Sequence, residues 1–148
     1  MADTIQKVQY FYTGVSDKPC EGAKVFNAPK DAGVALSAMV AFPKGRRAQI
    51  DFVALDAGAF KAAAKSAKIK LVGPKTAFLI QGDDRTGALV DITAKLAGAG
   101  INITAVHAIA AGSGRYGAIL WVKPRDVNKA ARLLIDAATE RKPQSHNL

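Results

Sequence analysis

The 148-residue sequence has little of what most metal, disulfide and membrane proteins need. Cys20 is the only cysteine, which excludes an internal disulfide and a multi-cysteine metal site. The two histidines, His107 and His146, have no Asp or Glu at metal-ligand spacing. No apolar run approaches the roughly 20 residues of a membrane-spanning helix, and the N-terminal MADTIQKVQ has no apolar signal core. We therefore expect a cytoplasmic protein without a metal or a cofactor.

Recognisable catalytic arrangements are also missing. No paired carboxylates and no serine–histidine combination stand out. Gly112 and Gly114 precede a predicted strand rather than a helix, so they indicate a hairpin turn and not a dinucleotide fingerprint. Cys20 follows Lys18 near a predicted helix start, a setting that can activate a thiol, but no base accompanies it. We predict that Cys20 fills a small-residue position and that the protein is not an enzyme.

Positive charge is in excess. The chain carries 21 basic and 12 acidic residues, which gives a formal net charge of +9. Residues 1–74 contain 11 basic and 6 acidic residues, and residues 75–148 contain 10 and 6. Because neither half is a basic tail, the charge favours anionic partners without identifying one.

The clearest pattern of elements lies between Lys75 and Lys123. It predicts a strand at 77–80, a loop at 82–87, a helix at about 88–98, a strand at 101–110 and a strand at 116–123. Asp126 is placed to cap a further helix that ends near Thr139. One stripe of that helix is apolar: Val127, Ala130, Ala131, Leu134 and Ile135.

The first half of the chain predicts the same order of elements. The expected strands lie at 5–13, 34–42, 48–54 and 69–72, and the expected helices at 21–32 and 57–67, the second capped by Asp56. Pro29 falls inside the first helix, where it predicts a kink or an early end. This order is the split βαβ, or ferredoxin-like, arrangement: an α+β fold whose antiparallel sheet has helices on one face.

The two halves match residue by residue at a spacing of 67, which predicts an internal duplication. The matched pairs include Asp17 with Asp84, Cys20 with Gly87 and Gly33 with Gly100. A gap of two residues in the following turn then aligns Ile50 with Ile119, Phe52 with Trp121 and Val53 with Val122. The predicted modules are 1–73, the more diverged copy, and 74–140, followed by a flexible tail at 141–148.

The motifs Asp84-Arg85-Thr86-Gly87-Ala88-Leu89 and Gly100-Ile101-Asn102-Ile103 resemble those of the ACT domain, a small ligand-sensing module of many enzymes of amino-acid metabolism. The resemblance covers Lys75–Lys123 strongly. It implies two tandem ferredoxin-like (βαββαβ) ACT modules and a non-enzymatic, allosteric protein that binds a small effector, an amino acid above all. Since no catalytic domain is present in this sequence, regulation would act on a partner enzyme or through the oligomeric state.

The loop after the first strand of the second module is the predicted ligand site. Terminal glycines let a backbone approach a ligand, amides at a helix start can receive a carboxylate, and Asp83 or Asp84 could receive an ammonium. The alternative is a plain glycine-bounded turn with Asp84 as helix cap. The predicted ligand-binding residues are Gly82, Asp83, Asp84, Arg85, Thr86, Gly87, Ala88, Asn102, Ile103 and Thr104. The second possible site is Ser16, Asp17, Lys18, Pro19 and Cys20.

Single-stranded RNA binding is the alternative function, because RNA-recognition domains share this strand order. The segment from Arg115 to Trp121 resembles their aromatic octamer, but Ala118 stands where a second stacking aromatic is needed. The first copy offers no stacking platform.

The second module lacks a fourth strand of its own in the sequence. In the ferredoxin-like order this absence would leave the edge of Lys75–Gln81 unpaired, and an apolar open edge tends to pair with another chain. We therefore predict a homo-oligomer, a two-fold dimer.

Overall fold

The computed structural model describes residues 3–136 and shows an α+β fold, as predicted. The elements are β1 (Thr4–Ser16), α1 (Glu21–Asp31), β2 (Leu36–Lys44), β3 (Arg47–Ala54), α2 (Ala57–Ser66), β4 (Val72–Asp83), α3 (Val90–Gly98), β5 (Ile103–Gly112), β6 (Arg115–Val122), a 3-10 turn (Pro124–Asp126), α4 (Val127–Ala131) and a π turn (Arg132–Asp136). No helix within residues 3–136 is long and apolar enough to cross a membrane. The expected cytoplasmic location stays a prediction.

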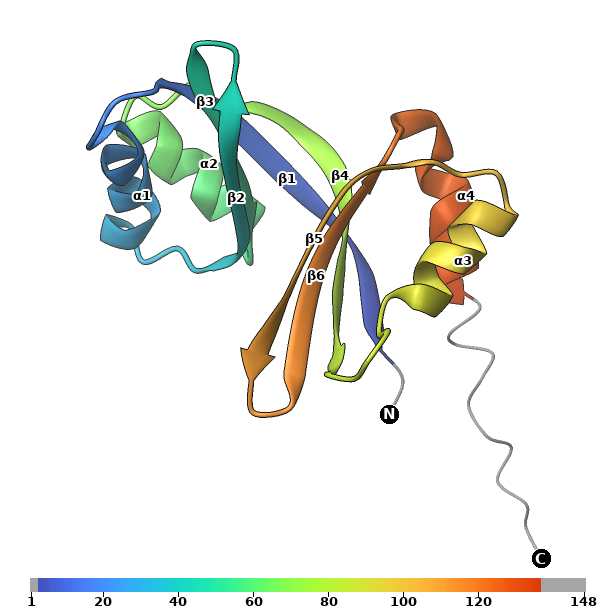
Figure 1. Cartoon of the computed structure of the whole chain (residues 1–148). Helices are drawn as coiled ribbons and strands as arrows, with labels where there is room; N and C mark the ends of the chain where they lie inside the picture. Colours follow the sequence, from blue (N-terminus) through green and yellow to red (C-terminus); the bar gives the residue numbers. More distant parts are fainter. Residues whose placement is uncertain (1–2, 137–148) are drawn as a thin grey trace, which may run out of the picture. The chain divides into compact units, whose positions relative to one another are not determined.

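The chain divides into two compact units. The first unit is residues 9–75, and the second unit combines the residues up to Val8 with those from Thr76 onward. In the first unit β3 pairs antiparallel with β2 and β1, and in the second unit β6 pairs antiparallel with β4 and β5. Within each unit, the helices pack on the sheet: α1 and α2 in the first, α3 and α4 in the second (Figure 1).

Aromatic side chains fill the core of the first unit. Phe52 of β3 is fully buried, and its ring centroid lies 5.1 Å from that of Phe60 on α2. Phe11 of β1 lies 6.0 Å from Phe60, and Val25 of α1 closes the cluster. Because β3 alternates faces along its length, Ile50 and Phe52 point to the same side and meet both helices.

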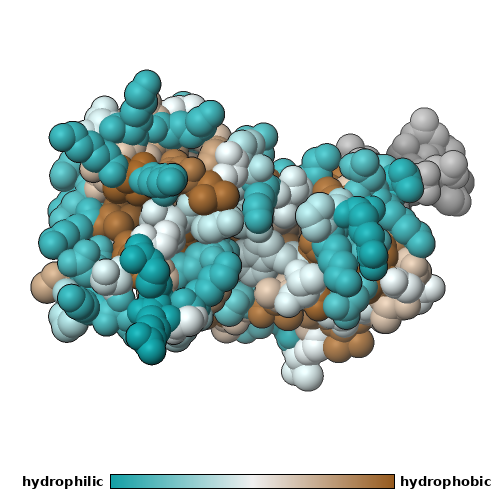
Figure 2. Space-filling view, turned by 90° about the horizontal axis from the view of Figure 1, so that it is seen from above, coloured by the Kyte–Doolittle hydropathy of each residue, from teal (hydrophilic) through white to brown (hydrophobic). Residues whose placement is uncertain are grey.

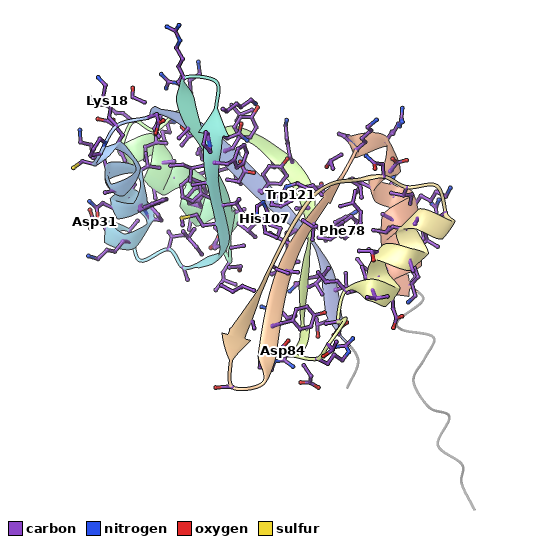
Figure 3. All side chains as sticks on the ribbon, viewed as in Figure 1. Lys18, Asp31, Phe78, Asp84, His107 and Trp121 are labelled. Atoms are coloured by element: carbon purple, nitrogen blue, oxygen red, sulfur yellow. The ribbon has the colours of Figure 1, made fainter. Side chains whose placement is uncertain are left out.

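The second unit has a more aliphatic core. Phe78 and Ile80 of β4 are fully buried against Leu96 of α3 and Leu134, which follows α4. Figure 3 shows Phe78 on the side of the strands where α3 and α4 lie. Each residue of the apolar stripe predicted after Asp126 is buried in this core or packed against it: Val127, Ala130, Ala131, Leu134 and Ile135. That part of the prediction is confirmed; the predicted helix end at Thr139 and the tail at 141–148 lie outside the described residues.

β4 is longer than the sequence predicts: it is one continuous strand where separate strands at 69–72 and 77–80 were expected. A separate strand at 69–72 is wrong: β4 begins at Val72 and continues through Pro74 to Asp83. Its start lies against β1, since a Cβ at Gly73 would come within 2.9 Å of the Tyr10 carbonyl oxygen. Its end lies against the beginning of β1, since a Cβ at Gly82 would collide with the Asp3 carboxylate. Each unit thus contains part of β1 and part of β4.

This arrangement bears on two predictions. The expected cut at residue 73 lies close to the observed division at Lys75, but the first eight residues group with the second unit rather than the first. The expected open edge at Lys75–Gln81 is wrong, because β1 lies on the side of β4 that β6 leaves free. The reasoning that led from this edge to a dimer therefore fails, although the dimer itself is not tested by it.

The register corrects the predicted alignment of the two halves. Phe11 pairs with Phe52 and Phe78 pairs with Leu120, so Phe52 corresponds to Leu120 and not to Trp121. The physical reason is a one-residue irregularity in β5 between Ala110 and Gly112, which makes β5 one residue longer than β2. A bulge inserts a single residue into one strand, whereas the alignment assumed two extra residues in the turn.

Pro29 neither stops nor shortens α1 before Asp31. It lies in the last turn of the helix and is buried. The predicted early end is therefore wrong, because Pro29 lies two residues before the last residue of the helix, where the loss of one N–H affects only the final turn.

Candidate functional site

The loop between β4 and α3 has the geometry of a tight turn followed by a late helix start. α3 begins at Val90, two residues later than predicted. The Ala88 N–H donates to the Arg85 carbonyl oxygen at 3.2 Å, and the Val90 N–H donates to that of Gly87 at 2.9 Å. Gly87 has φ of +73°, a conformation that favours glycine. The loop is thus a fixed structure rather than an extended connection.

Asp83 is neutralised by a partner that the sequence analysis did not assign to it. Arg115 Nη1 donates to Asp83 Oδ1 at 2.8 Å, because the two residues are register partners on β6 and β4. This contact with Arg115 lowers the pKa of Asp83 below its ordinary value. Asp83 is therefore engaged in the hairpin and is a poor acceptor for a ligand ammonium.

Asp84, by contrast, has a carboxylate without a hydrogen bond or an ion pair to any residue in the range 3–136. Its backbone N–H donates to the Gly114 carbonyl oxygen at 2.8 Å, which fixes the residue against the β5–β6 turn. The alternative role as helix cap is wrong, because Leu89 occupies the N-cap of α3 and no side chain caps that end. An exposed, fixed and unpaired carboxylate is suited to hold a cation.

A shallow hollow of about 250 Å³ opens beside Asp84. Two segments form its walls, the end of the loop before α3 and the last part of β5, with Tyr116 of β6 between them. The lining residues are Asp84, Ala88, Leu89, Ala108, Ile109, Ala110 and Tyr116. Figure 3 shows Asp84 near the end of β4 and the β5–β6 turn. The hollow therefore offers one acidic group and an apolar wall.

Arg85 is partly exposed, and its side chain binds Asp3 at the beginning of the described chain. Its Nη1 and Nη2 atoms donate to Asp3 Oδ1 and Oδ2, both at 3.1 Å, and Nη1 also donates to the Asp83 carbonyl oxygen at 2.9 Å. The Asp3 side chain is only 10% exposed, and the Asp3 carboxylate raises the pKa of Arg85. Beside this pair, Tyr116 is 5% exposed, and its hydroxyl has no hydrogen-bond partner among the described residues. Burial raises the pKa of Tyr116, and the nearby Asp3 carboxylate raises it further.

Three of the predicted ligand-binding residues, Asn102, Ile103 and Thr104, lie far from this loop within the second unit. Ile103 pairs with Val122, whereas Asp83 pairs with Arg115, so seven residues of β6 separate the two levels. At about 3.3 Å per strand residue this separation is roughly 20 Å. Thr104 donates its hydroxyl to the Trp121 carbonyl oxygen at 3.1 Å, and Asn102 lies just before β5. Within this unit Asn102, Ile103 and Thr104 are therefore not part of the hollow.

The second possible site, Ser16 to Cys20, forms the corresponding loop of the first unit. The Lys18 N–H donates to the Ser16 carbonyl oxygen at 2.9 Å, and Arg47 occupies the place that Arg115 has in the second unit, as register partner of Ser16. Cys20 has φ of 74° and is exposed. This value matches that of Gly87, so the prediction that Cys20 takes a glycine position is consistent with its backbone. Whether the loop binds a ligand stays a prediction.

The features of the RNA-binding alternative are not on the surface. Tyr116 and Trp121, the aromatics of the octamer-like segment, are both buried, which removes the platform on which bases would stack. His107 is exposed on β5, with its ring edge-on to Trp121 at 5.9 Å. Within residues 3–136 no group of three or more His, Cys, Asp or Glu side chains could hold a metal ion.

Sequence reasoning missed two contributors to this region. Asp3 reaches Arg85 across 82 positions of the chain, and no local pattern signals such a contact. The wall from Ala108 to Ala110 comes from the end of β5, and no residue of this part of β5 was among those predicted; a role for Asn102, Ile103 and Thr104 in ligand binding stays a prediction. The direction of β5 relative to β4, which the split βαβ order makes parallel, was the available signal.

Comparison with known proteins gives the fold. No protein-family model and no curated protein sequence matches the chain. Among solved structures, a protein from Bacteroides thetaiotaomicron is similar over 90% of each chain, with a TM-score of 0.77 and 13% identity. The regulatory subunit of aspartate kinase from Thermus thermophilus, in its ligand-free form, is similar over 91% of this chain and 95% of its own, with a TM-score of 0.61 and 21% identity. That from Thermus flavus is similar over 93% and 95%, with a TM-score of 0.55 and 18% identity. The chain therefore shares its α+β fold with regulatory subunits of aspartate kinase.

Proposed function

We propose that this protein is a non-enzymatic regulatory protein that binds a small effector, an amino acid, at the loop Gly82–Ala88. The observation that carries the proposal is the hollow beside that loop, where Asp84 presents an unpaired carboxylate opposite an apolar wall. A volume of about 250 Å³ lies below the range of roughly 300–1,000 Å³ typical of drug-sized ligands, so it suits a small metabolite. The ammonium of an amino acid would contact Asp84, and its side chain would lie on Ala88, Leu89 and Ala108.

We further propose that the chain consists of two ACT modules of ferredoxin-like order. Three observations support the duplication. Both halves run strand, helix, strand, strand, helix. Cys20 and Gly87 share a left-handed backbone, with φ of 74° and 73°, and so do Gly33 and Gly100, with φ of 69° and 72°. The fourth strand of the first module would be the start of β4, and that of the second module would be the start of β1.

The regulated target would be an enzyme partner. The similar chains from Thermus are regulatory subunits of aspartate kinase, which associates this fold with control of an enzyme in another polypeptide. An effector changes such a partner only through different affinities for two states, a coupling of typically about 1–3 kcal/mol.

We also propose self-association through β5. This strand is at an edge of its sheet, and its sequence from Ile103 to Gly112 contains no Lys, Arg, Asp, Glu or Pro to block pairing. Val106 and Ile109 are exposed apolar residues on it. On the face shown in Figure 2, hydrophobic residues reach the surface in patches between hydrophilic ones. A second copy of the chain is the partner that this edge fits by symmetry.

The test is a thermal-shift screen of the twenty amino acids, followed by calorimetry on any that stabilises the protein. A ligand at 100 times its Kd adds about 2.7 kcal/mol. Asp84→Asn should weaken the binding of that amino acid at least about tenfold, since it removes the charge while keeping the shape. Gly87 is left unchanged because its positive φ would make any substitution destabilising.

Asp17→Asn, the equivalent change in the first unit, is the matched control and should leave this affinity unchanged. Equal binding by wild type and Asp84→Asn would show that the effector binds elsewhere. Binding of single-stranded RNA with a steep dependence on salt would instead support the alternative function.

A further inference from the structure

Arg85 is held in the geometry of a carboxylate receptor. Its two terminal nitrogens donate to the two oxygens of Asp3, both at 3.1 Å. The guanidinium is itself fixed within the loop, because it also donates to the carbonyl oxygens of Asp83, at 2.9 Å, and Ala88, at 3.5 Å. A planar fork that is positioned by backbone acceptors matches the two oxygens of a carboxylate.

Gly82 provides the space in which this carboxylate lies. Its backbone belongs to β4 and has no positive φ, so no turn requires a glycine here. A Cβ at this position would collide with Asp3 Oδ1 and lie 3.0 Å from Tyr116 Cε1. The missing side chain therefore opens a cradle between Arg85 and Tyr116, and the Asp3 carboxylate fills it.

The cradle contains a second donor, the Tyr116 hydroxyl, which lies near the Asp3 carboxylate but forms no hydrogen bond of normal geometry with it. The Tyr116 hydroxyl is buried, and no residue in the described range accepts its proton. Buried hydroxyls nearly always have a partner, because leaving one unsatisfied costs stability. Asp3 is attached to the first residue of β1, Thr4, and this attachment limits how far its carboxylate can reach. A free carboxylate would not have that limit.

We propose that this cradle is a binding site for a small free carboxylate, and that Asp3 occupies it as an internal competitor. Binding would exchange the Asp3 carboxylate for the ligand's carboxylate on Arg85, add a hydrogen bond from Tyr116 and release the beginning of β1. Carboxylate binding in the cradle does not depend on effector binding in the hollow. The cradle and the hollow share Tyr116 and the loop, so the cradle could also regulate the hollow; that role rests on the proposed function.

The test uses acetate, the simplest carboxylate, and follows the Arg85 side-chain Nε resonance by NMR. Asp3→Asn keeps the size of the side chain and removes the competing charge. In this variant acetate should shift the Arg85 resonance saturably, with a half-saturating concentration at least about fivefold lower than in the wild type. Fivefold is the lower end of the usual coupling between two sites. Asp3→Asn combined with Tyr116→Phe should bind acetate more weakly than Asp3→Asn alone, and Asp3→Asn combined with Arg85→Lys should show no saturable effect on the rest of the spectrum.

Sodium chloride at the same ionic strength and methylammonium chloride are the controls for salt and for cation binding. Equal acetate affinity in wild type and Asp3→Asn would overturn the proposal, and so would affinity that survives the added Arg85→Lys. If Asp3→Asn does not fold, hydrogen exchange in the wild type decides: saturating acetate should speed exchange of the amides of residues 4–8, and unchanged exchange would refute the displacement of Asp3. Acetate binding without any response to amino acids would reject the proposed function and leave the cradle standing.

Discussion

Cys20 holds a backbone conformation that costs an L residue energy. Its φ is 74°, in the left-handed region, at the position where the other half of the chain has Gly87 with φ of 73°. For residues with a side chain this conformation costs roughly 1–2 kcal/mol, and part of the gain from removing it is lost to the greater chain entropy of glycine in the unfolded state.

Cys20→Gly should therefore raise the free energy of unfolding by about 0.5–1 kcal/mol. Urea denaturation measures the change. Cys20→Ala is the control, because alanine retains the same strain and removes only the thiol, which is exposed. Because both variants lack the thiol, a Cys20→Gly protein that is less stable than Cys20→Ala would show that the strain is too small to offset the chain entropy of glycine.

α2 shows how one side chain fixes the start of an element. Asp56 has an extended backbone at the N-cap, and its Oδ1 accepts the Ala59 N–H at 3.0 Å. The cap was predicted from the sequence and is confirmed. No such side-chain bond exists at the starts of α1, α3 and α4, so the cap predicted at Asp126 is wrong.

Asp56→Ala should lower the free energy of unfolding by about 1 kcal/mol, since the Ala59 N–H loses its acceptor. Asp56→Asn keeps an oxygen in place and should cost far less. Equilibrium denaturation of both proteins gives the comparison. Equal losses in the two variants would mean that charge at the helix start, rather than the capping hydrogen bond, stabilises α2.

At the scale of the whole molecule, self-association tests the role of β5. Replacing Val106 and Ile109 together by Lys adds two charges to an edge strand whose side chains are already exposed, 41% and 72%. We expect dimerisation to weaken at least about tenfold, which corresponds to about 1.4 kcal/mol, while the fold stays intact.

Sedimentation at micromolar concentration separates a 15.5 kDa chain from its dimer. Leu55→Lys is the matched control, because Leu55 is 76% exposed and lies outside the strands. A wild-type protein that sediments as a monomer across this range would contradict the proposal, and so would a dimer that resists both lysines.

The sequence by itself determined the local elements and their order, because these depend on neighbours in the chain. The stripe from Val127 to Ile135, the cap at Asp56 and the glycine-like place of Cys20 all follow from spacing and residue type. The loop Gly82–Ala88 was predicted as a site for the same reason: its glycines and aspartates are adjacent.

Tertiary structure alone decided the contacts that join distant segments. β1 lies beside β4, so the edge at Lys75–Gln81 is not open. β4 itself begins at Val72, so no separate strand forms at 69–72. Arg115 meets Asp83 across 32 positions because the register of β4 and β6 pairs them, and Asp3 meets Arg85 across 82 positions because β1 lies beside β4. Register depends on the pairing of whole strands, down to a single bulged residue in β5, and no local pattern contains that information.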